Sequence, residues 1–450
     1  MISEEQVLDA LRNIIDPDLQ RDIVSLGFVK DLSIQGGAVR FSIELTTPAC
    51  PVKAKFQADA EAAVRSLPGV DSVSVTMTAQ QRKPRPELQN SPLKQVATII
   101  AVSSCKGGVG KSTVAALLAR AIQREGHSVG LLDLDIYGPS LPTLLRVPFP
   151  EVYMRGEQIL PIEVDGLKTM SMGYLIGDKP AVMRGPMAAN YTLQILHQTD
   201  WGALDYLIID LPPGTGDIQL SLTQQAEIDG AIMVTTPQAL SLVDVARGIL
   251  MFEKVNVPVL GIVENMAYFV CDNCDKKHYI FGDPTATLKD RFGLDTLAQL
   301  PLIPGLSDAS TRDAGSGFSA FASLADHLHR AVGKRRAEGT EGPVAEAIPG
   351  AIQVRWPDGF SAQLPNKQVR ASCRCALCVQ EMTGEALLDP ETIPDDITVE
   401  SLSPLGHYAL AITWSDGHSS GIFSWEHLRG LAEPTANACG GGCACGGDHH

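Results

Sequence analysis

A glycine-rich stretch with two lysines carries the clearest chemistry in this sequence. It runs from Cys105 to Thr113 and reads Cys-Lys-Gly-Gly-Val-Gly-Lys-Ser-Thr, between an apolar, β-branched segment (96–100) and a helix-forming segment (114–122). A strand, a glycine turn and a helix in this order aim backbone N–H groups and a positive helix end at one point, which is how a chain binds phosphate. We predict a nucleotide site with Lys111 at the β- and γ-phosphates and Ser112 on Mg²⁺.

The stretch differs from the G-x-x-x-x-G-K-[ST] loop because Cys105 stands at the first glycine position and a lysine precedes the glycine pair. It resembles the deviant Walker A motif of the MinD, ParA and nitrogenase iron protein class. The resemblance implies that Lys106 reaches across a nucleotide-sandwiched dimer to the phosphates of the partner. It implies these nucleotide contacts: Lys106, Gly107, Gly108, Val109, Gly110, Lys111, Ser112 and Thr113.

Three aspartates follow predicted buried strands. Asp133 and Asp135 come after the strand 128–132, and Asp210 ends the strand 206–210. Ligands of parallel α/β sheets gather at the carboxyl ends of the strands, so these side chains are expected to face the phosphates. By resemblance to the same ATPase class, Asp135 positions the attacking water, while Asp133 and the Walker B carboxylate Asp210 belong to the Mg²⁺ shell.

Later segments add to the predicted nucleotide site. The loop from Gly214 to Asp217, where prolines precede glycines, suits a switch that senses the γ-phosphate and moves on hydrolysis. The resemblance to the ATPase class implies that Asn265, at the end of the strand 259–265, reads the adenine. It implies a second base contact at Pro301.

A C-x-x-C pair, Cys271 and Cys274, lies in the segment 268–282. Zinc or an iron-sulfur cluster needs four ligands, so the other two thiolates are expected from a second subunit, which places the site on a two-fold axis. The segment resembles the Mrp/ApbC branch of these ATPases, the iron-sulfur carriers, which implies a [4Fe-4S] cluster bridging a homodimer. From the residues alone, half of a zinc knuckle is the alternative, with His278 as a further candidate ligand.

Residues 3–77 predict a small α+β unit. Ser3 and Gln6 form a capping-box pattern that starts a helix ending at Asp16-Pro17. A strand (39–45), a helix (51–66) and a strand (73–75) follow. The unit resembles the PaaD/SufT-type domain of iron-sulfur maturation proteins. Cys50 precedes a helix start, where the helix dipole lowers the pKa of a thiol, and is a candidate functional cysteine.

Three more thiols lie close together in a third, tryptophan-bearing unit. Cys373, Cys375 and Cys378 need one imidazole to complete a tetrahedral site, and His418 supplies it, with His407 and His427 as rivals. The unit resembles the γ-butyrobetaine-hydroxylase N-terminal-like domain, which implies zinc, although a labile cluster stays open. In the glycine-rich tail, mobile thiols suit metal capture or handover, and they are Cys439, Cys443 and Cys445.

Composition limits the number of domains, the class of partner and the cellular compartment. The 450 residues suggest several domains, and the net charge of −16 disfavours a nucleic-acid partner. With no long apolar run and an acidic N-terminus, we expect a cytoplasmic chain that contacts no membrane, whose cysteines are metal or redox ligands. The predicted fold class is α/β, with a doubly wound parallel sheet at 96–332. A small α+β domain (1–78) precedes it and a small β-rich metal-binding domain (350–432) follows it. Linkers are predicted at 79–95 and 333–349, and a flexible tail at 433–450.

These observations predict an ATP-dependent iron-sulfur carrier. It would use ATP, Mg²⁺ and a [4Fe-4S] cluster, with Zn²⁺ as a further candidate, and hydrolyse ATP slowly. Its partners would be a second copy of itself, upstream cluster-assembly proteins and apo iron-sulfur proteins. One alternative is a MinD/ParA-like spatial regulator, which would need a membrane helix or a basic DNA face. The other is an ATPase whose C-x-x-C pair binds structural zinc.

Overall fold

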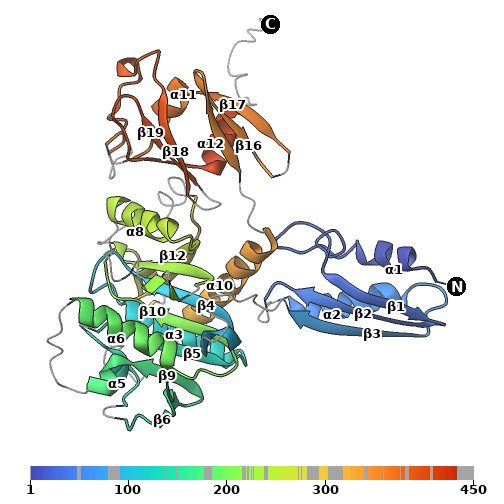
Figure 1. Cartoon of the computed structure of the whole chain (residues 1–450). Coiled ribbons are helices and arrows are strands. Elements are labelled where there is room, and N and C mark those ends of the chain that lie inside the picture. The colour runs from blue at the N-terminus through green and yellow to red at the C-terminus, as the bar shows by residue number, and fades with distance from the viewer. Residues whose placement is uncertain are drawn as a thin grey trace, which may run out of the picture. The chain divides into compact units, whose positions relative to one another are not determined.

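The computed structural model of the chain forms two compact units (Figure 1). Unit 1 comprises Met1–Lys289 and Leu294–Glu341, and unit 2 comprises Asp290–Gly293 and Gly342–His450. The structure describes residues 2–47, 52–79, 92–136, 138–147, 150–176, 185–214, 219, 222–223, 225–226, 228–237, 242–271, 273–274, 276–280, 293–302, 318–338, 343–357, 359–375, 377–380, 385–405 and 409–432. Within these ranges no helix has both the length and the apolar character that crossing a membrane requires.

The N-terminal module of unit 1 is a three-stranded sheet with two helices. Its elements are α1 (Glu4–Leu11), β1 (Val29–Gln35), β2 (Ala38–Leu45), α2 (Lys53–Arg65) and β3 (Ser72–Ala79). The central strand β2 is antiparallel to β1 and parallel to β3. The predicted capping box of Ser3 and Gln6 is present. Helix α1 ends at Leu11 and not near Asp16, whose carboxylate instead accepts two following N–H groups and closes a turn.

A large sheet forms the centre of unit 1. Its described strands are β4 (Val96–Ser103), β5 (Val129–Asp133), β8 (Ile162–Val164), β9 (Leu167–Ser171), β10 (Leu204–Asp210), β11 (Gly230–Thr235), β12 (Val259–Val270), β13 (Lys277–His278) and β14 (Thr296–Pro301). The order is β13-β12-β11-β4-β10-β5-β9-β8, with β14 also paired to β12. The predicted parallel sheet is confirmed in its core, while β8 and β13 pair antiparallel with their neighbours.

Helices and small elements complete unit 1 (Figure 1). They are η2 (Pro92–Gln95), α3 (Lys111–Arg124), α4 (Leu141–Leu144), β6 (Met154–Arg155), β7 (Gln158–Ile159), α5 (Met172–Ile176), α6 (Gly185–Gln198), α8 (Leu242–Lys254) and α10 (Phe318–Glu338). Helix α3 packs on β4, β5 and β10, and α10 packs on α3 and β14. β4 and β10 are buried at nearly every position, which explains their continuous apolar sequence.

Ordered elements occupy parts of both predicted linkers. Residues 333–338 continue α10, and Val344–Ile348 is already a strand of unit 2. The basic run around Arg336 belongs to the end of α10. The Arg336 side chain is only 16% exposed, and its guanidinium donates to the Ala97 carbonyl (2.9 Å) and the Thr98 hydroxyl (3.1 Å). In the first linker, β3 extends to Ala79 and η2 begins at Pro92, and what lies between is outside the described residues.

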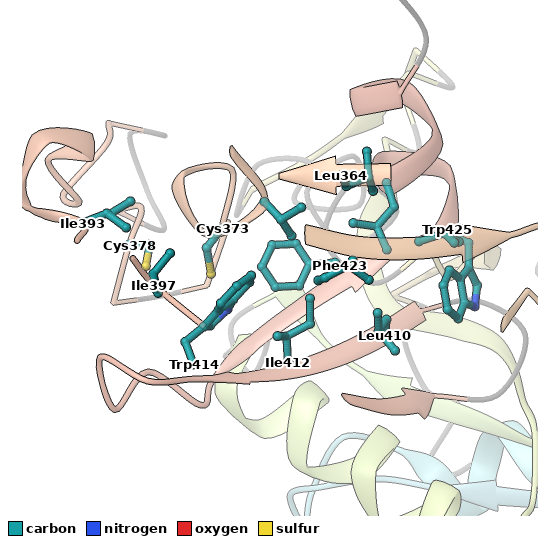
Figure 2. Packing of buried hydrophobic residues seen from close by; sticks show 14 of the residues in the cluster. Leu364, Cys373, Cys378, Ile393, Ile397, Leu410, Ile412, Trp414, Phe423 and Trp425 are labelled. Atoms are coloured by element: carbon teal, nitrogen blue, oxygen red, sulfur yellow. The ribbon is translucent and has the colours of Figure 1, made fainter. Parts of the chain in front are cut away.

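Unit 2 consists of two three-stranded antiparallel sheets and two α-helices in the described ranges. Its elements are β15 (Val344–Ile348), β16 (Ala351–Arg355), β17 (Ser361–Pro365), α11 (Asn366–Ala371), η5 (Pro390–Thr392), β18 (Val399–Leu405), β19 (Ala409–Trp414), β20 (Gly421–Ser424) and α12 (Trp425–Ala432). Figure 2 shows the core, in which Phe423 and Ile412 lie between Trp414 and Trp425. The sulfurs of Cys373 and Cys378 are beside the Trp414 end of this core.

Candidate functional site

The glycine-rich loop joins β4 to α3, as predicted. Gly108 (φ +79°) and Gly110 (φ +81°) adopt the left-handed conformation that favours glycine. A Cβ atom on Gly110 would also collide with the side-chain amide of Asn265. The loop therefore needs its glycines both for the turn and for close packing. Its last glycine is the N-cap of α3, so the helix begins at Lys111 with its positive end at the loop.

Lys111 forms a buried ion pair with Asp210, whose carboxylate accepts a hydrogen bond from Nζ. The two side chains are 6% and 1% exposed. The sheet register sets Asp210 directly opposite Asp133 on β5, so two carboxylates share one buried position. Burial, with the charge of Asp210 adding to it, raises the pKa of Asp133 to about 7. Burial also raises the pKa of Asp210, although Lys111 opposes this.

The two carboxylates differ in their remaining contacts. Asp133 accepts backbone N–H groups from Asp135 (3.0 Å), Ser140 (3.1 Å) and the residue after it, and the hydroxyl of Ser171 (3.0 Å). Asp133 thus fixes the loop that carries Asp135, which is half-buried and accepts the Gly138 N–H through Oδ1 (3.2 Å). In contrast, Oδ2 of Asp210 is buried and accepts no hydrogen bond from the residues that the structure describes. The Asp210 carboxylate also interacts with the side chain of Ser112 at the start of α3, and the two oxygen-bearing side chains suit Mg²⁺.

Lys106 is held by a residue that the sequence did not single out. Its Nζ lies 2.8 Å from Oδ2 of Asp244 in the first turn of α8. The neighbouring Cys105 thiol donates to the backbone carbonyl of Asp244 (2.9 Å). Burial and the Asp244 charge raise the pKa of Cys105 to about 11, so this thiol stays protonated and unreactive near neutral pH. The glycine loop and α8 are thereby joined through one aspartate.

The predicted base-contact residues lie beside the loop. Asn265 is 8% exposed, and its amide donates to the Val109 carbonyl (2.9 Å), so it braces the glycine loop. Pro301 ends β14 opposite Tyr268 of β12. Gly214 has φ +106° and donates its N–H to the Ser104 carbonyl (2.9 Å). The rest of the predicted switch, 215–217, lies outside the described residues.

The C-x-x-C pair directly follows β12, which extends to Val270 through an irregularity at Met266 (φ +57°). The Cys271 N–H donates to the Lys276 carbonyl (3.0 Å), and the Cys274 N–H donates to the Cys271 carbonyl (3.3 Å), so a tight turn brings both thiols together. Their sulfurs and a ring nitrogen of His278 lie within 4.8 Å of one another. Cys271 is half-buried and Cys274 is exposed. One strand thus connects Asn265 at the nucleotide loop with the thiol pair.

Exposed apolar side chains flank the thiol pair. Val270 is 43% exposed, Tyr279 39% and Ile280 62%. The His278 ring stacks on Phe269, with centroids 5.0 Å apart. Adjoining exposed apolar side chains are a feature of protein–protein contact surfaces.

In unit 2, the structure brings the predicted thiols and His418 together. Nε2 of His418 lies 3.4 Å from Sγ of Cys373, 3.5 Å from Sγ of Cys375 and 3.8 Å from Sγ of Cys378. The thiols follow α11, and the imidazole comes from the turn between β19 and β20. The hydrogen bond from Cys373 lowers the pKa of Cys375, whereas this bond raises the pKa of Cys373 and burial raises that of Cys378, so the metal-free set favours one thiolate, on Cys375. Three sulfurs and one nitrogen match the donor set of structural zinc.

Arg370 also belongs to this site, although the sequence analysis did not identify it. It is 5% exposed, and it donates to Sγ of Cys378 (3.4 Å) and to the Asp416 carboxylate (2.8 Å). Asp416 in turn accepts the His418 N–H (3.0 Å), so one arginine positions ligands from both segments. His427, an alternative candidate for the fourth ligand, instead forms a hydrogen bond with the Ser372 hydroxyl (3.0 Å).

Several predicted residues lie outside the described ranges: His407, Cys50, Cys439, Cys443 and Cys445.

Known proteins resemble the chain along most of its length. The Fe-S cluster assembly factor HCF101, chloroplastic, of Oryza sativa subsp. japonica is 43% identical over 445 residues, covering 95% of this chain and 83% of that protein. The iron-sulfur cluster carrier protein of Synechocystis sp. is 49% identical over 290 residues, covering 63% and 82%. A solved structure, the nucleotide-binding protein in complex with ADP from Archaeoglobus fulgidus, is 38% identical with a TM-score of 0.44, covering 54% and 90%.

Family comparisons divide the chain into three parts. Residues 4–76 match the family described as iron-sulfur cluster assembly protein, and residues 349–429 match gamma-butyrobetaine hydroxylase-like, N-terminal. Residues 95–331, more than half of the chain, match NUBPL iron-transfer P-loop NTPase. The chain therefore belongs to the iron-transfer P-loop NTPases, the family of the iron-sulfur cluster carrier proteins.

Proposed function

We propose that this chain is an ATP-dependent carrier that holds a [4Fe-4S] cluster between two copies of itself and passes it to apo iron-sulfur proteins. The observation that carries the proposal is β12, which joins the nucleotide loop at Asn265 to the thiol pair after Val270. A [4Fe-4S] cluster is held by four thiolates, and Cys271 with Cys274 supplies two. A second copy supplies the other two, and the exposed Tyr279 and Ile280 become buried against it.

The nucleotide acts through the glycine loop. Lys111 leaves Asp210 to bind the β- and γ-phosphates, and the freed carboxylate holds Mg²⁺ together with Ser112. Asp133 keeps the following loop in place through its hydrogen bonds, so that Asp135 can orient the attacking water. Catalysis of this kind rests on positioning and charge stabilisation. Hydrolysis is expected to be slow and coupled to cluster loading or transfer, with clusters received from upstream assembly proteins.

Unit 2 is proposed to hold Zn²⁺ on Cys373, Cys375, Cys378 and His418. Zinc there would fix the end of the core beside Trp414.

Anaerobic reconstitution with iron and sulfide tests the carrier proposal. The wild type is expected to gain a broad visible absorbance band and about four iron atoms per dimer. A Cys271→Ala/Cys274→Ala variant should lose both, because the cluster loses every ligand at the interface. Cys105→Ala, which removes the half-buried thiol of the glycine loop, is the control and should retain the band. Equal iron in the double variant and the wild type would move the cluster to other thiols and contradict the proposal.

Releasing Lys106 from Asp244 should speed ATP hydrolysis. In Asp244→Asn, the lysine is free to reach the nucleotide of the partner without first breaking its own ion pair. Because Lys106 is 48% exposed, that pair is worth only about 0.2–1 kcal/mol, which corresponds to a rise of about 1.4- to 5-fold in the steady-state rate. Adding Lys106→Met to Asp244→Asn should abolish the gain. A slower Asp244→Asn enzyme would mean that Asp244 serves the active assembly instead.

A further inference from the structure

A second cluster of candidate metal ligands lies in unit 1, separate from Cys271 and Cys274. Glu125 is the C-cap of α3, His127 precedes β5, and His329 lies on α10. One ligand atom from each lies within 4.8 Å of the other two. Nε2 of His329 is 2.7 Å from Oε2 of Glu125, and the rings of His127 and His329 are 5.7 Å apart. Two segments distant in sequence, the connection between α3 and β5 and helix α10, thus present two imidazoles and one carboxylate to one point.

Neighbouring groups hold these side chains as outer-shell partners hold metal ligands. Nδ1 of His329 lies 2.9 Å from the Tyr206 hydroxyl, which can accept as well as donate a hydrogen bond. In the structure Nε2–H donates to the Glu125 carboxylate and Nδ1 accepts from the Tyr206 hydroxyl. When a metal ion replaces the proton between Nε2 and Glu125, Nδ1–H donates to that hydroxyl instead. Asp205, which Ser128 holds through its N–H and hydroxyl (both 2.8 Å), lies beside His127, with Oδ2 3.9 Å from Nδ1, which is a charge contact and not a hydrogen bond. An imidazole oriented by a carboxylate or hydroxyl is the usual arrangement of a metal-bound histidine.

Charge and access also suit a cation. The cluster lies at the C-terminal end of α3, where the helix dipole is negative and favours positive charge. His329 is buried (its side chain is 2% exposed), but Glu125 and His127 are 35% and 20% exposed, which leaves a path for an ion from solvent. β5 and β10 begin beside the cluster and end at Asp133 and Asp210, so it lies at the edge of the sheet opposite the nucleotide loop.

We propose that Glu125, His127 and His329 bind a divalent first-row transition metal ion such as Zn²⁺, Co²⁺ or Fe²⁺. Two imidazoles and a carboxylate suit such ions, whereas Mg²⁺ and Ca²⁺ prefer oxygen ligands. The ion connects the α3–β5 connection, which carries Glu125 and His127, to His329 of α10. It is distinct from the cluster on Cys271 and Cys274 and from the site in unit 2.

Co²⁺ binding to the full-length protein, followed by Zn²⁺ competition, tests this site. Co²⁺ on nitrogen and oxygen ligands gives weak visible bands without the intense thiolate charge-transfer bands of the cysteine sites, so the classes are separable in one spectrum. The wild type is expected to bind one such ion per chain. His127→Ala and Glu125→Gln should lose it, and Tyr206→Phe should weaken binding by about 10- to 100-fold because an outer-shell partner is removed.

His197→Ala is the matched control, since this half-buried histidine on α6 is outside the cluster. It should bind Co²⁺ as the wild type does. A bound ion should also raise the unfolding temperature of unit 1 in the wild type and the control, but not in His127→Ala, because ligands of the native state stabilise it. Unchanged cobalt stoichiometry and affinity in His127→Ala and Glu125→Gln would overturn the proposal and leave the cluster as a hydrogen-bonded structural group.

Discussion

Replacing Lys111 by methionine is expected to abolish ATP hydrolysis and to destabilise unit 1. The hydrolysis rate should fall by about 100- to 1,000-fold, since a preorganised charge at the reacting phosphates is lost. The stability should fall because Asp210 is 1% exposed and would remain buried beside Asp133 without its cation. Breaking a buried ion pair in this way costs up to about 3–5 kcal/mol. Hydrogen exchange at the amides of β4 and β10, which the pair joins to α3, measures the loss.

Lys106→Met is the matched control, because it removes the same charge from the same loop. The Lys106 side chain is 48% exposed, so its pair with Asp244 contributes at most about 1 kcal/mol. We expect Lys106→Met to impair hydrolysis in the proposed dimer while leaving hydrogen exchange close to that of the wild type. If Lys106→Met and Lys111→Met lost the same protection of their amides from hydrogen exchange, burial of the Lys111–Asp210 pair would not set the stability of unit 1.

Much of the nucleotide site could be predicted because its signals are local. The glycine spacing fixes the loop between β4 and α3, and each aspartate directly follows an apolar strand. The pairing of Asp133 with Asp210 also follows, since parallel neighbours end at the same edge of a sheet. The thiols and imidazole of unit 2 were found because few residue types bind metal and they recur at short spacing.

The contacts that hold these groups could not be predicted, because they come from distant segments. Asp244 reaches Lys106 from α8, Ser171 reaches Asp133 from β9, and Arg370 joins Cys378 to Asp416. Nothing in the local pattern around Ser171 or Asp244 separates it from an ordinary polar residue at an element end. The basic run at the end of α10 was mistaken for a linker for the same reason, since its partners lie in the sheet.

Removing the zinc proposed for unit 2 is expected to unfold that unit while unit 1 stays folded. Structural zinc contributes an apparent free energy of about 10–16 kcal/mol, whereas a whole domain is stable by only about 5–15 kcal/mol. Cys373 and Cys378 are 3% and 2% exposed and belong to the core, so unbound thiols there would also leave that end loosely packed. A strong chelator, or His418→Ala, should therefore abolish the cooperative unfolding transition of unit 2.

Tryptophan fluorescence can report this selectively. Of the four tryptophans, Trp356, Trp414 and Trp425 belong to unit 2, and each is at most 8% exposed. Loss of the metal should shift their emission to longer wavelength, whereas Cys274→Ala, which removes an exposed thiol of unit 1, should not. Metal-free protein with unshifted emission would show that the Trp414–Phe423 core is sufficient for folding. Because Trp414 lies beside Cys373 in that core (Figure 2), its emission is the most direct measure of whether the metal or the apolar packing holds unit 2 together.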